Sequence, residues 1–174
     1  EEQTYLADET VFDIFTHTFL RGTPENALDA PGDIVVTESF ARRYFGDEDP
    51  MGKTLETDMG FSLQVSAVIA DLPGNSHLKF DALLAMKGLA LIMGEDQFNS
   101  RDSNAFWSLG VFTYVLVNEG SAMQSVIDGF DPFYDKYFAQ VGKLLSGSFE
   151  LMATPLAGLH FRTGLDLDQP VGNI

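Results

Sequence analysis

The stretch from Ile34 to Leu72 constrains the fold most, because it sets signals for a strand, a helix, a turn and a hairpin in a fixed order. Ile34–Val36 is a run of β-branched residues, which favours a buried strand. Thr37 can cap a short helix after that strand, and Gly46 is suited to end it. The predicted apolar side of the helix consists of Phe40, Ala41, Tyr44 and Phe45.

A turn and a two-stranded hairpin are expected next. Asp49-Pro50-Met51-Gly52 offers proline, whose φ is fixed, and glycine where the chain leaves the turn, so we expect a positive φ at Gly52. Two extended runs flank the break at Asp58-Met59-Gly60. Strict alternation in the second run predicts one buried face, made of Phe61, Leu63, Val65, Ala67 and Ile69.

Weaker signals occur on both sides of this stretch. A short helix is expected from about Thr10, and Leu83–Met93 has the apolar character of another. The polar composition of Gly94–Asn104 indicates a loop.

The last third of the chain predicts strand, helix and strand. Val111–Val117 is rich in apolar and β-branched residues, which is typical of a buried strand, and Phe149–Pro155 is expected to be the last strand. Apolar residues from Ser121 to Lys143 recur at helical spacing. Asp131 can cap a second helix with Pro132 in its first turn, so a break is expected there. The whole pattern predicts an α+β fold.

Composition excludes several classes of function. The formal net charge of −16 argues against nucleic acid as a partner, because Lys and Arg contacts to phosphate provide most of that affinity. The absence of cysteine excludes disulfides and thiolate metal sites. The longest apolar run, Ala82 to Met93, is shorter than the roughly 20 residues of a membrane-spanning helix, and no secretion signal is visible in this fragment.

One cluster has the residue types of a metal or acid–base site. Asp71, His77, Lys79 and Asp81 are close in sequence, and imidazole and carboxylate groups are common metal ligands. The alternative, which we favour, is a turn at Asn75-Ser76 whose backbone is supported by its polar neighbours. The histidines lack zinc-site spacing, and no nucleophile elbow or phosphate-binding glycine loop occurs. We therefore expect no catalytic residue, no bound metal and no cofactor.

Aromatic residues in the last third allow a further hypothesis. Trp107 with Phe106 and Phe112, and the helix around Phe133 to Phe138, have the composition of a binding face for an apolar peptide or lipid. Core packing explains the same spacing, and we favour it.

Two runs of residues resemble a known family. The first is TESFARRYFGDEDPMGK, from Thr37 to Lys53, in which the residues from Ala41 onward match the pattern A-[KR]-[KR]-[YL]-F-G-D-E-[DN]-P-[IM]-G-K. The second is DLPGNSHLKFD, from Asp71 to Asp81. Together they resemble the extracytoplasmic (periplasmic core) domain of MacB-type, FtsX-like ABC transporter permeases. Ala67 departs from that family, which usually has glycine there.

The resemblance implies two lobes. Residues 1–30 and 106–174 would form a βαβ-like, porter-type α/β lobe close to the membrane helices, and residues 31–105 an inserted, mainly β lobe with a short helix. The residues expected to maintain the structural motif of the inserted lobe are Phe40, Tyr44, Phe45, Gly46, Pro50, Gly52, Pro73 and His77.

The resemblance also implies a function without catalysis. The domain would relay ATP-driven motion from the cytoplasm to substrates or partner proteins outside the membrane, in efflux or in lipoprotein or peptide export. Its partners would be the transmembrane helices of its own full-length chain, an ABC ATPase subunit or domain, and a periplasmic adaptor or substrate protein. It would lie on the periplasmic side of the bacterial inner membrane, anchored by flanking helices absent from this fragment.

Two other hypotheses remain open from the residues. A free-standing periplasmic module for a peptide or lipid would need an exposed apolar cleft. A hydrolase or metal enzyme would have to be built on Asp71, His77 and Asp81.

Overall fold

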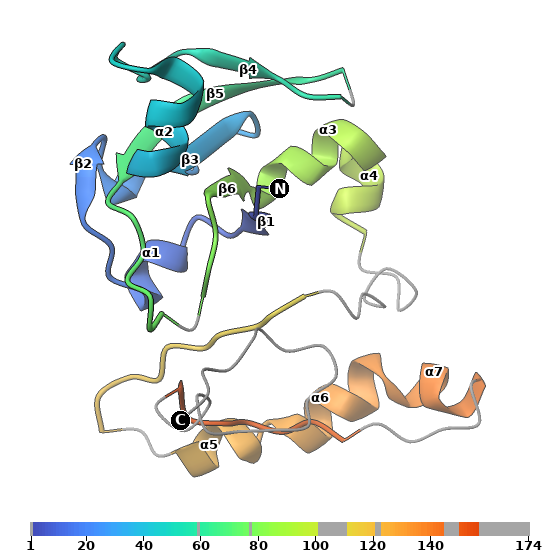
Figure 1. Cartoon of the computed structure of the whole chain (residues 1–174). Coiled ribbons are helices and arrows are strands. Elements are labelled where there is room, and N and C mark those ends of the chain that lie inside the picture. Colours follow the sequence, from blue (N-terminus) through green and yellow to red (C-terminus); the bar gives the residue numbers. More distant parts are fainter. Residues whose placement is uncertain are drawn as a thin grey trace. The chain divides into compact units, whose positions relative to one another are not determined.

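The computed structural model describes residues 2–58, 60–76, 78–100, 111–120, 123–144 and 150–156. The chain forms two compact units, Glu1–Phe98 and Asn99–Ile174 (Figure 1). Among the described residues, no helix has both the length and the apolar character needed to cross a membrane.

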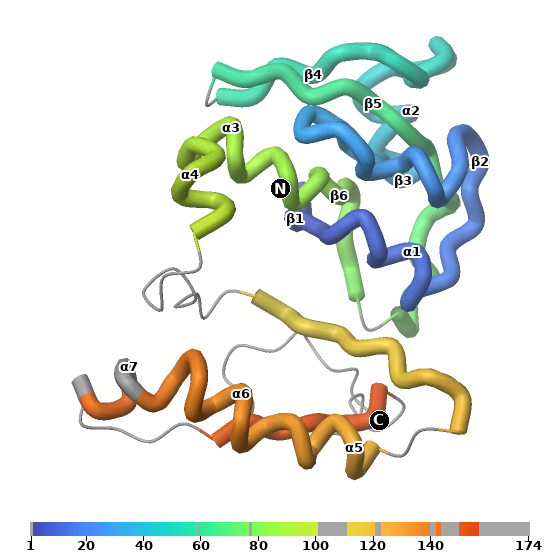
Figure 2. Tube along the Cα trace, turned by 180° about the vertical axis from the view of Figure 1, so that it is seen from behind, coloured from blue at the N-terminus to red at the C-terminus, as the bar shows by residue number. Residues whose placement is uncertain are grey.

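The first unit is built on a six-stranded mixed sheet. Its strands are β1 (Thr4–Ala7), β2 (Phe19–Arg21), β3 (Asp33–Thr37), β4 (Thr54–Glu56), β5 (Ser62–Ile69) and β6 (Ala82–Ala85). The order is β1-β6-β3-β5-β2, and β4 also pairs with β5. Figure 2 shows β3 between β5 and β6. The β1–β6 and β3–β5 pairs are parallel, and the other pairs are antiparallel.

Strand β5 is hydrogen-bonded along both edges. β3 runs along one edge, from Gln64 to Ile69. On the other edge β4 pairs with the first half of β5, and β2 pairs with Val68 and Ile69. This strand therefore joins the hairpin to the rest of the sheet.

A bulge at Ser66 overturns the predicted strict alternation of β5. Ile34 pairs with Val65, but the next residue of β3, Val35, pairs with Ala67, so Ser66 is passed over. Side chains after the bulge consequently change face. Leu63, Val65 and Val68 lie in one cluster of buried side chains, whereas Ala67 and Ile69 lie in another.

The two clusters cover opposite faces of the sheet, because successive residues of β3 alternate between them. The α2-side core consists of Ile34, Val36, Phe40, Ala41, Leu63, Val65, Val68 and Ala82. The α1-side core consists of Ala7, Ala27, Leu28, Val35, Ala67, Ile69, Phe80, Leu83 and Ala85.

Helix α2 (Glu38–Phe45) forms as predicted. The Thr37 hydroxyl accepts a hydrogen bond from the Phe40 amide at 3.3 Å, which caps the first turn. Gly46 ends the helix with a φ of +61°. The helix buries Phe40 and Ala41, whereas Tyr44 is 52% exposed and stacks on the Phe40 ring at 4.4 Å between centroids.

The predicted turn also forms, but it begins one residue later than expected. The Lys53 amide donates to the Pro50 carbonyl at 3.0 Å, so Pro50 is the first residue of the turn and Gly52 the third. The φ of Gly52 is +72°, and the expected positive value is confirmed.

The remaining helices of the first unit are short. They are α1 (Val11–Ile14), the 3₁₀ turns η1 (Pro24–Asn26) and η2 (Met86–Gly88), α3 (Leu89–Met93) and α4 (Glu95–Phe98). The helix predicted for Leu83–Met93 is wrong at its start, because Leu83 lies in β6 and pairs with both neighbouring strands. The loop predicted from Gly94 contains α4.

Strands β1 and β2 place the first 30 residues in the same sheet as β3, β5 and β6. The predicted grouping of residues 1–30 with residues 106–174 stays a prediction, as does the boundary near residue 105.

Helices dominate the described part of the second unit. They are α5 (Met123–Ile127), α6 (Phe130–Tyr137) and α7 (Ala139–Leu144). The predicted break occurs, but it lies before Phe130, with Gly129 at the N-cap, and Pro132 falls in the first turn of α6. The strand predicted for Val111–Val117 is wrong. Within the described residues this segment pairs with no strand, and Val115 is 64% exposed. Residues 150–155 also form no strand.

Candidate functional site

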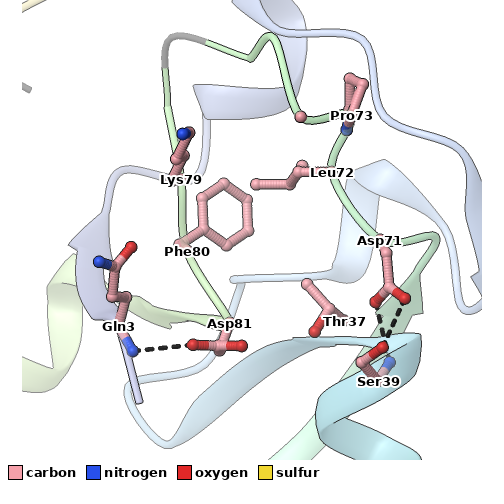
Figure 3. A pocket seen from close by; sticks show the side chains of 10 residues that line it. Gln3, Thr37, Ser39, Asp71, Leu72, Pro73, Lys79, Phe80 and Asp81 are labelled. Atoms are coloured by element: carbon pink, nitrogen blue, oxygen red, sulfur yellow. Dashed lines mark hydrogen bonds between the residues drawn. The ribbon is translucent and has the colours of Figure 1, made fainter. Parts of the chain in front are cut away.

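The predicted cluster around Asp71 and Asp81 lines an open pocket of about 440 Å³ at the start of α2 (Figure 3). Three segments meet there: the residues before β1, the β3–α2 junction and the loop from residue 71 to residue 81. The lining residues are Gln3, Thr37, Ser39, Asp71, Leu72, Pro73, Gly74, Lys79, Phe80 and Asp81.

Asp71 is hydrogen-bonded to the first turn of α2. Its carboxylate accepts a hydrogen bond from the Ser39 amide at 2.9 Å and another from the Ser39 hydroxyl at 2.5 Å. A carboxylate at a helix N-terminus is favoured because the first amides have no partner within the helix. Asp71 therefore acts as a second cap for α2, beside Thr37.

The same contacts set the charge state of Asp71. The Ser39 hydroxyl, followed by the Ser39 amide, holds the pKa of this carboxyl below its usual value, and the nearby positive charges of Arg42 and Arg43 act in the same direction. Hydrogen bonds to the charged form favour ionisation. Asp71 is thus an anion at neutral pH, which is the opposite of a carboxyl adapted to donate a proton.

Asp81 bonds to three other segments. Its carboxylate accepts a hydrogen bond from the Gln3 amide at 2.9 Å and contacts Nη2 of Arg43 at 3.2 Å. Its backbone carbonyl accepts from the Thr37 amide at 2.9 Å, and its amide donates to the Gln3 carbonyl at 2.7 Å. This aspartate joins the N-terminal segment, α2 and the end of β3.

The turn that we favoured at Asn75-Ser76 is present, since the Ser76 amide donates to the Pro73 carbonyl at 2.9 Å. The Asp81 carboxylate was expected to support the backbone of this turn. It instead accepts a hydrogen bond from the backbone of Gln3, which is distant in sequence. His77 lies outside the described residues. Lys79 is exposed at the rim of the pocket, and the described residues contain no group of three metal-ligating side chains.

Both carboxylates at this site are thus engaged by hydrogen bonds from other segments. The ring of Phe80 lies in the pocket beside Leu72 (Figure 3). Ser39, Arg43 and Gln3 were not singled out from the sequence. Only the position of Ser39 in the first turn of the predicted helix pointed to it.

The other residues of the predicted structural motif are distributed around this site. Phe40 is buried and Phe45 packs against the α2-side core, with Nζ of Lys53 at 5.6 Å from the Phe45 ring centre. Pro73 lines the pocket. That these residues maintain the lobe stays a prediction.

The aromatic binding face is only partly within the described residues. Phe106 and Trp107 lie outside them, whereas Phe112 is 41% exposed and Phe133 is 46% exposed. The Phe133 ring contacts Tyr137 and Phe138, with centroids 4.9 and 5.7 Å apart.

The site thus brings together the two runs of residues that carried the family resemblance. Thr37, Ser39 and Arg43 belong to the first run, and Asp71 and Asp81 to the second. The contacts between the two runs include Ser39 with Asp71, Arg43 with Asp81, and the Thr37 amide with the Asp81 carbonyl.

Comparison with solved structures identifies several similar chains, including the following two. One is a domain of a protein described as a permease from Porphyromonas gingivalis, with a TM-score of 0.54, 22% identity, and coverage of 78% of this chain and 59% of that one. The other is the periplasmic region of MacB from Actinobacillus actinomycetemcomitans, with a TM-score of 0.46, 10% identity, and coverage of 82% and 64%. This chain spans less than two thirds of either structure. The first similarity concerns the fold alone.

Comparison with curated protein sequences gave no significant match. A family model does match the sequence, over residues 1–132, and its description is MacB-like periplasmic core domain. The matched residues include the whole sheet and both interlocked runs. Because this match covers most of its length, the chain belongs to the family of MacB-like periplasmic core domains.

Proposed function

We propose that this chain is the extracytoplasmic part of an ABC transporter permease and relays ATP-driven motion from the cytoplasm to substrates or partner proteins outside the membrane. The family match over residues 1–132 is the observation that carries the proposal. The domain itself performs no catalysis in this proposal.

The construction of the first unit supports a relay. A part that transmits motion has to move as a rigid body. β5 is bonded on both edges, and loop 71–81 is fixed at both ends, by Ser39 at Asp71 and by Gln3 and Arg43 at Asp81. The sheet, α2 and this loop therefore constrain one another.

The proposed partners follow from this role. They are transmembrane helices of the full-length chain, an ABC ATPase subunit or domain, and a periplasmic adaptor or substrate protein. The proposed location is the periplasmic side of the bacterial inner membrane, and the proposed transport class is efflux or the export of lipoproteins or peptides.

Distance measurements in the full-length protein test the relay. This chain has no cysteine, so Glu25→Cys and Glu56→Cys, both at exposed positions of the first unit, allow spin labelling. With the ATPase present, the distance between these two labels is expected to stay constant when ATP is added. The distance from Glu56→Cys to a label on a transmembrane helix is expected to change. A constant second distance during active ATP hydrolysis would contradict the relay.

A second hypothesis is a free-standing periplasmic module for an apolar peptide or lipid. The exposed rings of Phe112 and Phe133 are the observation in its favour. The topology of the full-length gene product separates the two hypotheses. Protease protection of hydrophobic helices flanking the domain supports the permease, and complete release of the protein from spheroplasts by osmotic shock supports the module.

A further inference from the structure

Strand β1 is an edge strand held by a single neighbour in the sheet. It has four residues and lies at the end of the strand order, where it pairs with β6. Ala7 is buried and Tyr5 is partly buried against the α1-side core, whereas Thr4 and Leu6 are exposed. Because two of the four side chains of β1 stay in water, apolar burial provides only part of the free energy that keeps it in place.

The residues just before β1 are held by Asp81. Gln3 and Asp81 exchange two backbone-directed bonds, one from the Gln3 amide to the Asp81 carboxylate and one from the Asp81 amide to the Gln3 carbonyl. The Ala82 amide also donates to the Gln3 carbonyl, at 3.3 Å. These bonds fix β1 at the residue where it enters the sheet.

Arg43 connects this entry point to helix α2. Its Nη2 lies 3.1 Å from Oε2 of Glu2 and 3.2 Å from Oδ1 of Asp81. The other Glu2 oxygen accepts from the Tyr44 hydroxyl at 3.4 Å. Oε2 of Glu2 is covered and makes no hydrogen bond within the described part of the chain, so Arg43 is the group that compensates its charge.

We propose that Glu2, Arg43 and Asp81 form a clamp that holds β1 in the sheet and whose release lets β1 detach while the other strands stay paired. β3, β5 and β6 keep their mutual pairing and both cores when β1 leaves, apart from the contacts of Tyr5 and Ala7. The clamp therefore controls a local opening rather than global unfolding. The proposal stands whether or not the domain is part of a transporter.

Hydrogen exchange on the 174-residue chain tests the clamp, with Arg42 as the matched control. Arg42 is the residue before Arg43 in α2. It forms an ion pair with Glu38 of the same helix, and both side chains are exposed. Arg43→Ala is expected to accelerate amide exchange in residues 4–7 about three- to fivefold, near the upper limit for a partly exposed ion pair. Arg42→Ala is expected to leave these amides unchanged. In both variants the amides of residues 63–69 are expected to exchange as in the wild type.

Asp81→Asn tests whether Arg43 acts through the carboxylate. The amide oxygen can still accept from the Gln3 amide, but the charge that attracts Arg43 is lost. The double variant with Arg43→Ala is expected to accelerate exchange in residues 4–7 by less than the product of the two single effects, because neighbouring residues in one network are coupled.

Three results would overturn the clamp. One is equal acceleration by Arg42→Ala and Arg43→Ala. Another is equal acceleration across residues 4–7 and 63–69, which would make β1 part of the global unfolding unit. The third is multiplicative effects of Arg43→Ala and Asp81→Asn.

Discussion

The two faces of the sheet are buried in different ways. The α2-side core comes almost entirely from one continuous stretch, Ile34 to Val68, and only Ala82 is added from elsewhere. The α1-side core draws on β1, on Ala27 and Leu28, on β3 and β5, and on the segment from Phe80 to Ala85. One face is therefore local in sequence and the other is assembled from distant parts.

The bulge at Ser66 connects the two faces. Before it, β5 contributes Leu63 and Val65 to the α2-side core, and after it Ala67 and Ile69 reach the α1-side core. The Ser66 hydroxyl contacts the carbonyls of Ile34, at 3.2 Å, and of Ala27. A single extra residue thus reverses the alternation along β5, and Val68, after the bulge, lies in the α2-side core.

Removing one large aromatic ring from either core is expected to cause the largest loss of stability. Phe40 is 5% exposed in the α2-side core and Phe80 is 7% exposed in the α1-side core. Phe40→Ala and Phe80→Ala are each expected to lower the free energy of unfolding by about 3 to 5 kcal/mol, as measured by urea denaturation. In hydrogen exchange, Phe40→Ala should loosen α2 first, and Phe80→Ala should loosen α1 and β2. The same exchange pattern in both variants would show that the cores unfold as one unit.

The substitution Gly22→Ala tests how closely β2 packs beside the bulge. Its φ is +76°, and an added Cβ would lie 2.7 Å from the Ser66 carbonyl oxygen and 2.8 Å from Cβ of Ala67. Gly22→Ala is expected to cost about 2 to 4 kcal/mol, because backbone strain and overpacking combine.

Gly52 is the matched control, since its φ is +72° but nothing lies within 4 Å of an added Cβ. Gly52→Ala is expected to cost about 1 kcal/mol, from backbone strain alone. Thermal or urea unfolding measures both variants. Equal losses would mean that β2 moves away from β5 at little expense.

Acidification below neutral pH should lower the free energy of unfolding through His17, which lies beside the α1-side core. The His17 ring lies 5.8 Å from that of Phe12 and 5.7 Å from that of Phe80, and its Nε2 is covered without a hydrogen-bond partner in the described residues. Burial lowers the pKa of His17 from its usual 6.5. The unfolded chain therefore binds the proton first, and the free energy of unfolding falls as the pH drops below about 6.5.

His17→Phe is expected to remove this part of the pH dependence. Urea denaturation at pH 7.5 and pH 5.5 measures it in both proteins. The two remaining histidines, His77 and His160, are unchanged in the variant, so a pH dependence that persists in full would assign it to them.

The smallest effect is expected at the second cap of α2. The lowered pKa of Asp71 means that this carboxylate stabilises the folded state above its ordinary pKa of 3.8, and that the contribution is lost as the pH falls through the lower folded-state value. Ser39→Ala is expected to lower the free energy of unfolding by about 1 kcal/mol at pH 7. As the pH falls below 3.8, the wild type and the variant should become more similar in stability. A difference that does not shrink on acidification would show that the hydroxyl acts without the Asp71 charge.

The sequence by itself determined the elements whose signals are local. The strand at Ile34–Val36, the Thr37 cap, the end of α2 at Gly46 and the positive φ of Gly52 depend on neighbouring residues and backbone sterics. The first of the two runs that carried the family resemblance lies in this stretch, and the match over residues 1–132 confirmed that resemblance.

Tertiary structure alone decided the pairings between distant segments. The bulge at Ser66 depends on how β3 aligns with β5, and the roles of Asp71 and Asp81 depend on Ser39, Arg43 and Gln3. The residues around Leu83 have high helix propensity. Leu83 nevertheless lies in strand β6, because β1 and β3 pair with it on both sides. A strand exists only with partners, and Val111–Val117, which has the composition of a strand, pairs with none among the described residues. Composition reports the preference of a segment, whereas hydrogen bonds between segments decide its structure.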